Sequence, residues 1–400
     1  MTRAALWTAA ALFLAGSPAV APAPPAVPPV SLVETAPVET SLDHADIADA
    51  KDVWPELVGS AQKSLDIAQF YVSDAKGKRL EPVLKAVEAA AGRGVKVRVL
   101  AEEKFYKTYP ETLDRLSALP NVTVRRYDVK RLMGGILHAK YFVVDRARAY
   151  LGSQNFDWRS LEHIQELGVR VSQPQVVQAL EDVFETDWAL AGGGESAARV
   201  RTVAAAAFPV QAGDAKLTLV AEPKGWLPDE ALWGLPRLVA LIDSAKKDVR
   251  VQVLTYRARG KERFPELEEA LQRAAKRGVK VELMVSEWSQ RPAVLEGLKA
   301  LHAPPGLTVK LVAIPPWSGG FIPFARVAHA KYLVVDGRAA WVGTANWERD
   351  YFYESRNVGL IIEGGALPQR LEQFFADTWN SPYAQALDPA RQYPMPRISE

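Results

Sequence analysis

The chain has 400 residues, of which 48% are hydrophobic and 24% charged, so it can bury a sizeable core and is not disordered throughout. Its net charge of +2 excludes a strong field over the whole molecule toward nucleic acid or anionic membrane, and any such attraction must come from local clusters. The sequence contains no cysteine, which excludes disulfides, thiolate metal sites and a cysteine nucleophile.

The N-terminal segment, residues 1–30, is predicted to be a signal peptide or leader. Arg3 precedes an apolar run over residues 4–15, which has the length of a signal-peptide hydrophobic region and is short for a membrane span. Several prolines follow among small residues and leave the cleavage point open. We therefore expect export to the periplasm or the medium, with membrane anchoring as the alternative if the leader is not cleaved.

The first predicted domain, residues 31–191, alternates apolar strands with helical segments. The run SLDIAQFYV from Ser64 predicts a buried strand, because β-branched and aromatic residues dominate a short apolar stretch. A helix-period segment over 80–91 follows and ends before Arg93-Gly94, a suitable helix C-cap. A second strand, a motif described below and a helix with Phe and Trp complete the domain; these segments are 94–100, 138–145 and 184–188.

The second predicted domain, residues 213–400, repeats these parts in the same order after a glycine-rich linker, 192–212. The offset between equivalent residues is 184 at Gly94 and Gly278 but 191 from the motif onward, so about seven residues are added in between. They fall near 313–324, a loop rich in Pro, Gly and aromatic residues. Alternating strands and helices in two copies predict two similar α/β sandwich domains that form an internal pseudo-dimer.

The pattern His-x-Lys-x-x-x-x-Asp occurs in both domains. It comprises His138, Lys140 and Asp145 in the first copy and His329, Lys331 and Asp336 in the second. Only five histidines exist in the chain, so two such patterns are unlikely by chance. Two copies of one catalytic half predict a single site assembled at the seam between the domains.

The residue types of the motif suit chemistry on a phosphate group. Histidine can attack phosphorus when its other ring nitrogen is held, and a lysine two residues on projects from the same face of a strand to neutralise a phosphate oxygen. Asn155 and Asn346, in Gly-Ser/Thr-x-Asn after each motif, can donate to the same oxygens. Asp145 and Asp336 are expected to be structural anchors or lysine partners rather than bases. No cofactor or metal is implied, because the lysines supply the positive charge.

The two histidines need different roles, one as nucleophile and one as the acid that protonates the leaving oxygen. The doubled motif resembles the phospholipase D superfamily. Segments such as SLDIAQFY, GGILHAKYFVVD, GSQNFDWRSLEHIQELGV and GTANWERDYF resemble one subfamily, the lysosomal phospholipase-D-like 5′ exonucleases of animals and their poxvirus relatives. The likeness covers nearly the whole chain from about residue 31. It implies the phospholipase D fold, with one active site at the pseudo-dimer interface.

The resemblance also implies residue roles, with His138 as nucleophile and His329 as acid. It places Lys140, Lys331, Asn155 and Asn346 around the phosphate, with Ser153 and Thr344 in support. Glu166 lies 28 residues after His138, where the superfamily has the acid that orients the nucleophilic histidine. The same count in the second half reaches Asn357, and Glu354 is then the nearest acidic candidate as partner of His329.

Residues outside the motifs are open to two interpretations. Basic residues just before the first motif and aromatic residues just before the second would form a rim for a nucleic-acid strand or a phospholipid headgroup, or else are a solvated charge run and ordinary core aromatics. These are Arg125, Arg126, Lys130, Arg131, Trp317, Phe321, Phe324 and Arg326. The remaining histidines, His44, His163 and His302, are predicted to be surface or satisfied core residues.

Three functions are compatible with these features. The first is a metal-independent phosphodiesterase that acts on single-stranded nucleic acid through a phosphohistidine, in the manner of a 5′ exonuclease. The second is a phospholipase D or phosphatidyl transferase that acts on phospholipids through the same intermediate. The third is an inactive envelope or scaffold protein, which the intact motifs disfavour. No obligatory protein partner is expected, and the chain would be a monomer or a homodimer.

Overall fold

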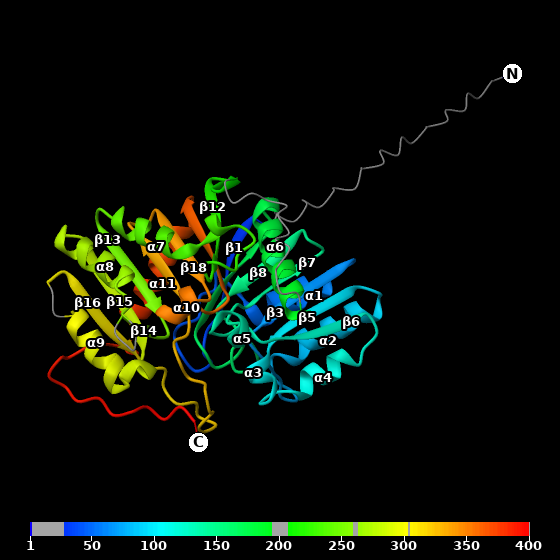
Figure 1. Ribbon diagram of the computed structural model, residues 1–400, viewed down its shortest axis with the longest axis horizontal. Helices are drawn as coiled ribbons and strands as arrows, with labels where there is room; N and C mark the ends of the chain where they lie inside the picture. The colour runs from blue at the N-terminus through cyan, green and yellow to red at the C-terminus, as the bar shows by residue number, and fades with distance from the viewer. Residues whose placement is uncertain (2–27, 194–206, 259–262, 303–304, 400) are drawn as a thin grey trace.

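The computed structural model describes residues 1, 28–193, 207–258, 263–302 and 305–399. The predicted leader lies almost entirely outside the described residues, as does most of the predicted linker. Figure 1 shows two α/β units side by side, the first coloured blue to green and the second light green to red. Within the ranges just given, no helix combines the length and hydropathy needed to cross a membrane.

The first unit is built on an eight-stranded mixed sheet in the order β2-β1-β10-β8-β7-β3-β5-β6. Strands β3, β5 and β6 are parallel, whereas β7, β8, β10 and β1 continue the sheet in antiparallel fashion. The strands are β1 Val30–Thr35, β2 Ala48–Asp49, β3 Ser64–Gln69, β5 Lys96–Glu102, β6 Val122–Tyr127, β7 Tyr141–Val144, β8 Arg148–Gly152 and β10 Glu166–Val171. A small separate pair joins β4 Val72–Ser73 to β9 Phe156–Asp157.

The second unit repeats this sheet with nine strands in the order β11-β12-β20-β18-β17-β13-β15-β16-β21. They are β11 Val210–Ala212, β12 Ala215–Glu222, β13 Asp248–Val253, β15 Lys280–Ser286, β16 Leu307–Val312, β17 Tyr332–Val335, β18 Ala339–Gly343, β20 Asn357–Gly364 and β21 Ala384–Ala386. Strands β14 Tyr256–Arg257 and β19 Trp347–Glu348 form the counterpart of the small pair. Residues 210–212, assigned from the sequence to the linker, are therefore part of the second sheet.

Helices cover the sheets of both units. The first unit has α1 Ala50–Gly59, α2 Glu81–Gly92, α3 Glu103–Tyr106, α4 Glu111–Ser117, α5 Val129–Met133 and α6 Pro174–Ala191. The second has α7 Gly234–Asp243, α8 Glu266–Lys276, α9 Pro292–His302, α10 Arg349–Tyr353 and α11 Leu367–Trp379, with two 3-10 turns, η2 Glu230–Leu232 and η3 Glu287–Gln290. The predicted fold of two similar α/β units is confirmed.

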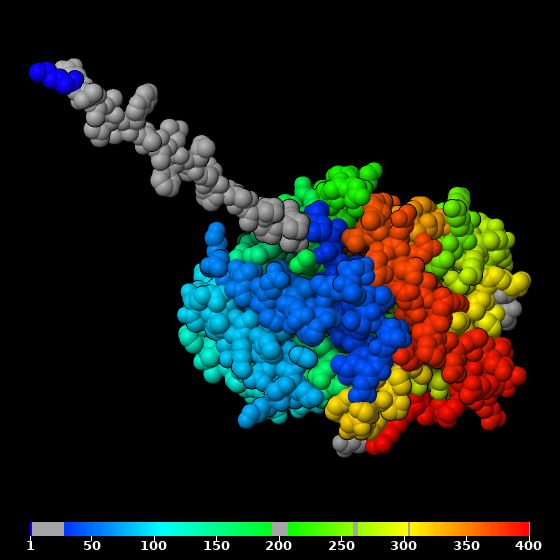
Figure 2. Space-filling model, turned by 180° about the vertical axis from the view of Figure 1, so that it is seen from behind, coloured from blue at the N-terminus to red at the C-terminus, as the bar shows by residue number. Residues whose placement is uncertain are grey.

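The largest hydrophobic core belongs to both units together. Tyr141 of β7 and Phe184 of α6 pack in the same buried cluster as Tyr332 of β17 and Phe374 of α11. Separate cores lie beneath α1 and α2 in the first unit and beneath α7 and α8 in the second. Figure 2 shows the blue N-terminal and orange C-terminal surfaces meeting along a continuous boundary. Burial of a common core therefore fixes the two units as a pseudo-dimer within one chain.

Glycine ends the second helix of both units in the expected way. Gly94 follows α2 with φ +92° and Gly278 follows α8 with φ +87°, a left-handed conformation that costs glycine little. Each glycine then leads into a central strand, β5 or β15. The repeat in the sequence thus corresponds to a repeat in the structure.

Candidate active site

The two motif histidines meet at the seam because short backbone bridges join the units there. Leu137 pairs with Arg356 and Gln165 pairs with Ala328, each in parallel fashion. The N–H of His138 donates to the carbonyl of Arg356 at 3.0 Å, and the N–H of His329 donates to the carbonyl of Gln165 at 2.8 Å. Each histidine is therefore positioned by the backbone of the opposite unit.

The side-chain partners of the histidines are crossed between the units. Nδ1 of His329 lies 2.7 Å from a carboxylate oxygen of Glu166, and Nδ1 of His138 lies 3.1 Å from the amide oxygen of Asn357. The predicted pairing of Glu166 with His138 is wrong, as is the pairing of Glu354 with His329. The bridges explain why, because Glu166 and Asn357 directly follow Gln165 and Arg356 and so face the histidine of the other unit. Glu354 instead pairs with Arg349 and is 37% exposed.

Hydroxyl groups hold both orienting side chains. Ser153 and Ser160 donate to Glu166, the latter at 2.9 Å. Thr344, the counterpart of Ser153, donates to the amide oxygen of Asn357 at 2.8 Å. The predicted supporting positions Ser153 and Thr344 thus contact the residues that orient the histidines, which restricts the imidazole rings to one orientation.

The two motif lysines are buried beside the histidines. The ammonium groups of Lys140 and Lys331 donate to the main-chain carbonyls of His138 and His329, respectively. Burial lowers the pKa of Lys331 to about 7 and lowers the pKa of Lys140 well below its usual range. A bound phosphate anion would favour the charged forms of both lysines and so raise their pKa values again. The pocket is therefore suited to bind a negatively charged group.

Burial also controls the other titratable groups of the site. It lowers the pKa of His138 and of His329, with the nearby lysines acting in the same direction. Burial raises the pKa of Glu166 to about 7, against the opposing effect of Lys331. The hydrogen-bonded Glu166–His329 pair therefore retains one transferable proton up to near neutral pH.

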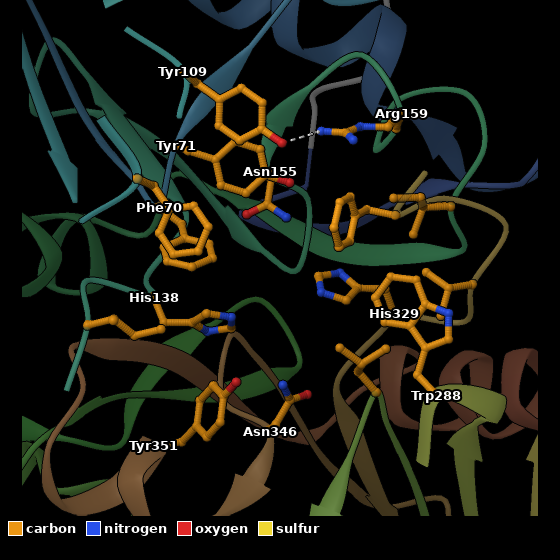
Figure 3. Close-up of a pocket in the computed structure, with 16 residues that line it drawn as sticks. Phe70, Tyr71, Tyr109, His138, Asn155, Arg159, Trp288, His329, Asn346 and Tyr351 are labelled. Atoms are coloured by element: carbon orange, nitrogen blue, oxygen red, sulfur yellow. Dashed lines mark hydrogen bonds between the residues drawn. The ribbon is translucent and has the colours of Figure 1, made fainter. Parts of the chain in front are cut away.

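Asn155 and Asn346 point into the space between the two histidines (Figure 3). Both are buried, and within the described part of the chain neither amide oxygen has a hydrogen-bond partner. Their amide nitrogens are suited to donate to phosphate oxygens, as the sequence predicts. Tyr351 adds an aromatic edge against His138, with ring centroids 4.9 Å apart.

One side of the site is lined by aromatic rings of the first unit. Phe70, Tyr71, Phe105 and Tyr109, which we call the aromatic wall, border a cavity of about 280 Å³ that contains both histidines. Tyr71 stacks on Tyr109 with centroids 5.0 Å apart, and Phe70 packs against Phe105 at 4.2 Å. The opposite side is formed mostly by residues of the second unit, which are Leu254, Trp288, Phe324 and Val327. Ile164 of the first unit completes it.

The motif aspartates are structural anchors. Asp145 accepts hydrogen bonds from the main-chain N–H groups of residues 62–64, and Asp336 accepts them from residues 246–248. Burial acts to raise the pKa of both aspartates, but these N–H donors lower it below the usual value. Each aspartate thus fixes the start of the neighbouring central strand, β3 or β13, and does not reach the lysines.

The predicted rim is largely absent from the cavity. Phe324 lines the cavity, whereas Arg125 packs on Trp188 and Arg326 is buried against main-chain carbonyls. Trp317 packs on His163, whose buried ring forms no hydrogen bond among the described residues, although its Nε2 lies 3.6 Å from a carboxylate oxygen of Glu162. His163 is therefore neither at the surface nor a hydrogen-bonded core residue, the two alternatives that the sequence suggested, and burial lowers its pKa to about 4.

The other two histidines have clear partners. His44 pairs with Glu34 of the first unit and Asp377 of the second, and His302 accepts a hydrogen bond from the N–H of Val309.

Sequence reasoning missed the aromatic wall, although a signal existed. Phe70 and Phe105 follow the carboxyl ends of the parallel strands β3 and β5, where α/β sheets commonly place their ligands.

Comparison with known proteins agrees with this geometry. A family model described as cardiolipin synthase, PLD-like domain, matches residues 56–188 and 238–379. The chain belongs to the phospholipase D superfamily. The two matched segments each contain one of the paired motifs, so the internal repeat is the repeat of this superfamily, and the chain is a phosphodiesterase.

Several relatives within the phospholipase D superfamily match almost end to end. The bovine 5′-3′ exonuclease PLD3 is 32% identical over 98% of this chain and 87% of its own length. The virion nicking-joining enzyme of vaccinia virus is 31% identical over 89% of each chain, and phospholipase D Z of Dictyostelium discoideum is 30% identical over 89% and 90%. The solved phosphatidylserine synthase of Haemophilus influenzae shares the fold, with a TM-score of 0.60, 12% identity and coverage of 84% and 85%.

Metal ligation is a separate matter from family membership. Among the residues that the structure describes, no group of three or more His, Asp or Glu side chains is arranged to hold a metal ion. Lys140 and Lys331 lie next to the histidines, and a bound phosphate anion would favour their charged forms. Metal independence stays a prediction, to be tested directly.

Proposed function

We propose that this protein is a metal-independent phosphodiesterase that cleaves single-stranded nucleic acid through a covalent phosphohistidine. The observation that carries the proposal is the unequal pairing of the two histidines that face one cavity. His138 is held by a neutral amide, and His329 is held by a carboxylate. The two partners suit two different chemical roles.

His138 has the surroundings of a nucleophile. The amide oxygen of Asn357 accepts from Thr344 and lies next to Nδ1 of His138, while its amide nitrogen donates to the carbonyl of Tyr351 at 2.9 Å. This arrangement places the imidazole proton on Nδ1 and leaves a lone pair on Nε2. Burial lowers the pKa of His138, which keeps the ring neutral and able to attack.

His329 has the surroundings of a general acid. The carboxylate of Glu166 stabilises a positive charge on the imidazole ring, and the pair retains one proton up to near neutral pH. The residues of the two units thus divide the roles of nucleophile and acid, with His138 and His329 assigned as the resemblance implies.

In the first step, Nε2 of His138 attacks phosphorus and the bond from phosphorus to the leaving oxygen breaks. His329 gives its proton to that oxygen, so a free hydroxyl leaves and the phosphoryl group stays on His138. In the second step, neutral His329 takes a proton from water, which attacks phosphorus and breaks the P–N bond. A phosphate monoester leaves, and both histidines regain their starting protonation. Lys140, Lys331, Asn155 and Asn346 are placed to stabilise the equatorial oxygens in both steps.

Single-stranded nucleic acid suits the cavity because its unpaired bases can stack on the aromatic wall. The bovine relative is named a 5′-3′ exonuclease, and the vaccinia relative is named a nicking-joining enzyme. One relative is named phospholipase D Z, and the apolar side of the cavity keeps phospholipid as the competing substrate.

We also propose that the protein is exported and that it is active as a monomer. The composition of residues 1–30 supports export, and N-terminal sequencing of the periplasmic or secreted protein would identify the cleavage point. Because both motif histidines and their partners come from one chain, a monomer would be active.

The deciding experiment incubates the purified protein in EDTA with either a 5′-hydroxyl oligonucleotide or phosphatidylcholine vesicles. We expect release of nucleotides from the oligonucleotide at an undiminished rate. Loss of activity in EDTA that returns on addition of a divalent cation would contradict the metal-free mechanism. Turnover of the lipid without turnover of the oligonucleotide would contradict the nuclease function.

A further inference from the structure

The two ends of the active-site cleft differ in how the units close over them. At one end, the segment between β6 and His138, residues 128–137, consists of α5 and a short loop, 134–136, whose N–H groups donate to the carbonyl of Glu354 and the hydroxyl of Ser355 in the second unit. At the other end, a long loop of residues 313–327 precedes Ala328 and His329 and contains the additional residues of the second unit. The two ends of this pseudo-twofold site are therefore bounded by segments of different length.

The long loop is tied to the first unit at several points. Ser318 donates to the carboxylate of Glu39, and Arg326 donates to the carbonyl of Val38 at 2.7 Å. The N–H of Arg326 also donates to the carbonyl of His163 at 3.1 Å. These contacts hold the loop against the first unit from its tip to the motif.

Arg159 completes this closure at the cavity itself. It is buried, forms an ion pair with Asp157 at 2.7 Å and donates to the carbonyl of Pro323 in the long loop at 3.0 Å. It also donates to the hydroxyl of Tyr109 at 3.4 Å, a contact drawn in Figure 3. Arg159 therefore joins the aromatic wall of the first unit to the long loop of the second.

This bridge is not repeated at the opposite end. The residue equivalent to Arg159, at the offset of 191, is Asp350, whose carbonyl accepts from the N–H groups of Glu354 and Ser355 within its own unit. Exposed basic side chains occur instead on α3 and α5, two helices that precede the short loop in the chain. They are Lys104, Lys130 and Arg131, which can attract the phosphates of an approaching strand.

We propose that the Arg159–Pro323 bridge and Phe324 form an end wall, so that the site accepts only a terminus of a nucleic-acid strand. This inference rests on the proposed nuclease function and specifies its substrate. The strand enters over the basic end of the cleft, and its terminal nucleoside is enclosed between the aromatic wall and Phe324. A cavity of about 280 Å³ is at the small end for ligand sites, which suits one nucleotide.

The test compares a linear oligonucleotide with a covalently closed circle of the same single-stranded sequence, both in EDTA. The wild-type enzyme is expected to degrade the linear strand and leave the circle intact. Arg159→Lys keeps a positive charge for Asp157 but loses the guanidinium bridge to Pro323. Phe324→Gly removes the ring from the wall and suits the left-handed backbone there, where φ is +58°.

Arg159→Lys should raise the ratio of circle to linear cleavage about tenfold or more above the wild-type background, the effect of losing one hydrogen bond from a charged donor on an equilibrium. Phe324→Gly should raise the same ratio because it opens the wall. Phe321→Ala is the matched control, because this phenyl group is on the same loop and is 42% exposed, against 45% for Phe324, but does not line the cavity. Equal cleavage of circle and linear strand by the wild type, or resistant circles in both variants, would overturn the end wall. Absence of cleavage of both substrates by the wild type would contradict the nuclease function itself.

Discussion

Glu166 of the first unit lies 2.7 Å from Nδ1 of His329 in the second unit. Asn357 of the second unit holds His138 of the first in the same way, at 3.1 Å. Neither unit therefore contains a complete histidine pair with its partners, and the active site exists only when the two units are packed together. The same crossing gives the two histidines chemically different partners.

Glu166→Gln should lower the rate of oligonucleotide cleavage by about 10²–10⁴-fold, the usual contribution of a general acid. The glutamine amide cannot stabilise an imidazolium ion on His329, so protonation of a poor leaving group is lost. A p-nitrophenyl phosphodiester needs no such proton, and the first step with this substrate should be nearly unchanged. Stopped-flow measurement of nitrophenolate release gives that step.

The matched control for this variant is Glu102→Gln. Glu102 is also buried, its pKa is also raised by burial to about 7, and its carboxylate accepts the N–H of Leu137, which a glutamine oxygen can replace. Glu102→Gln and Glu166→Gln could lower the rate of oligonucleotide cleavage equally, or Glu166→Gln could lower the rates with the oligonucleotide and the p-nitrophenyl phosphodiester equally. Either result would show that Glu166 acts through the stability of the protein and not through His329.

Tyr109→Ala should raise KM for an oligonucleotide about tenfold, because stacking on an aromatic side chain is worth roughly 1–3 kcal/mol per base. Tyr109→Phe keeps the ring and should retain most of the affinity. Tyr106→Ala is the control, since Tyr106 bonds to Asp114 outside the cavity. An unchanged KM in Tyr109→Ala, measured from initial rates, would contradict base stacking on the aromatic wall.

The buried ion pair at the seam offers a test of how the units are joined. Arg356 is fully buried and pairs with Asp187 of α6, whereas the equivalent residues Gln165 and Thr378 form a neutral hydrogen bond at 2.8 Å. Asp187→Thr leaves the guanidinium unpaired and should cost about 3–5 kcal/mol of unfolding free energy. The double variant Asp187→Thr/Arg356→Gln copies the neutral pair and should recover most of this loss.

Urea unfolding of the single and double variants measures these changes. Glu269→Ala, which removes the exposed ion pair with Arg263, should hardly alter the midpoint. The loss of unfolding free energy in the double variant could equal the sum of the losses in Asp187→Thr and Arg356→Gln. In that case the charge of each residue, and not the pairing of the two, determines the stability of the seam.

His44 should make the stability of the seam depend on pH. Burial opposes protonation, but Glu34 and Asp377 outweigh it and raise the pKa of His44 above its usual value of 6.5. A raised pKa in the folded state stabilises the protein below pH 6.5, and this contribution is lost as pH rises through the folded value.

Differential scanning calorimetry of the wild type and His44→Gln at several pH values measures this contribution. The difference in Tm should be largest at acidic pH and should shrink as the pH rises above neutrality. Asp377→Asn should reduce the acid-selective part of the difference, because it removes the carboxylate of the second unit. A difference in Tm that does not vary with pH would contradict the role of His44 as a charged link between the units.

The sequence predicted the repeated fold and the meeting of the two motifs, because strand and helix periodicity are local and the repeat is long. It did not predict which acid holds which histidine. Glu166 is 28 residues from His138 along the chain, but the backbone bridge of Gln165 to Ala328 turns it toward His329. A contact across the seam depends on the packing of two units, and spacing within one unit contains no information about it.

The aromatic wall escaped prediction for a related reason. Phe70 and Tyr71 follow β3, whereas Phe105 and Tyr109 belong to the segment after β5, and only the parallel pairing of these strands brings the four rings together. Arg159 was missed because its role requires the carbonyl of Pro323 from the other unit. Residues that act within one motif were predictable, and residues that act between units were not.

The most direct test of the two-histidine mechanism is mass spectrometric mapping of the phosphorylated residue. A rapidly quenched reaction of His329→Ala with a nucleotide p-nitrophenyl phosphodiester should accumulate a phosphoryl adduct on His138, because the first step needs no acid and the second lacks its base. His138→Ala should yield no adduct. Phosphorylation of His329 in the His138→Ala protein, with none on His138 in His329→Ala, would contradict the assignment of nucleophile and acid.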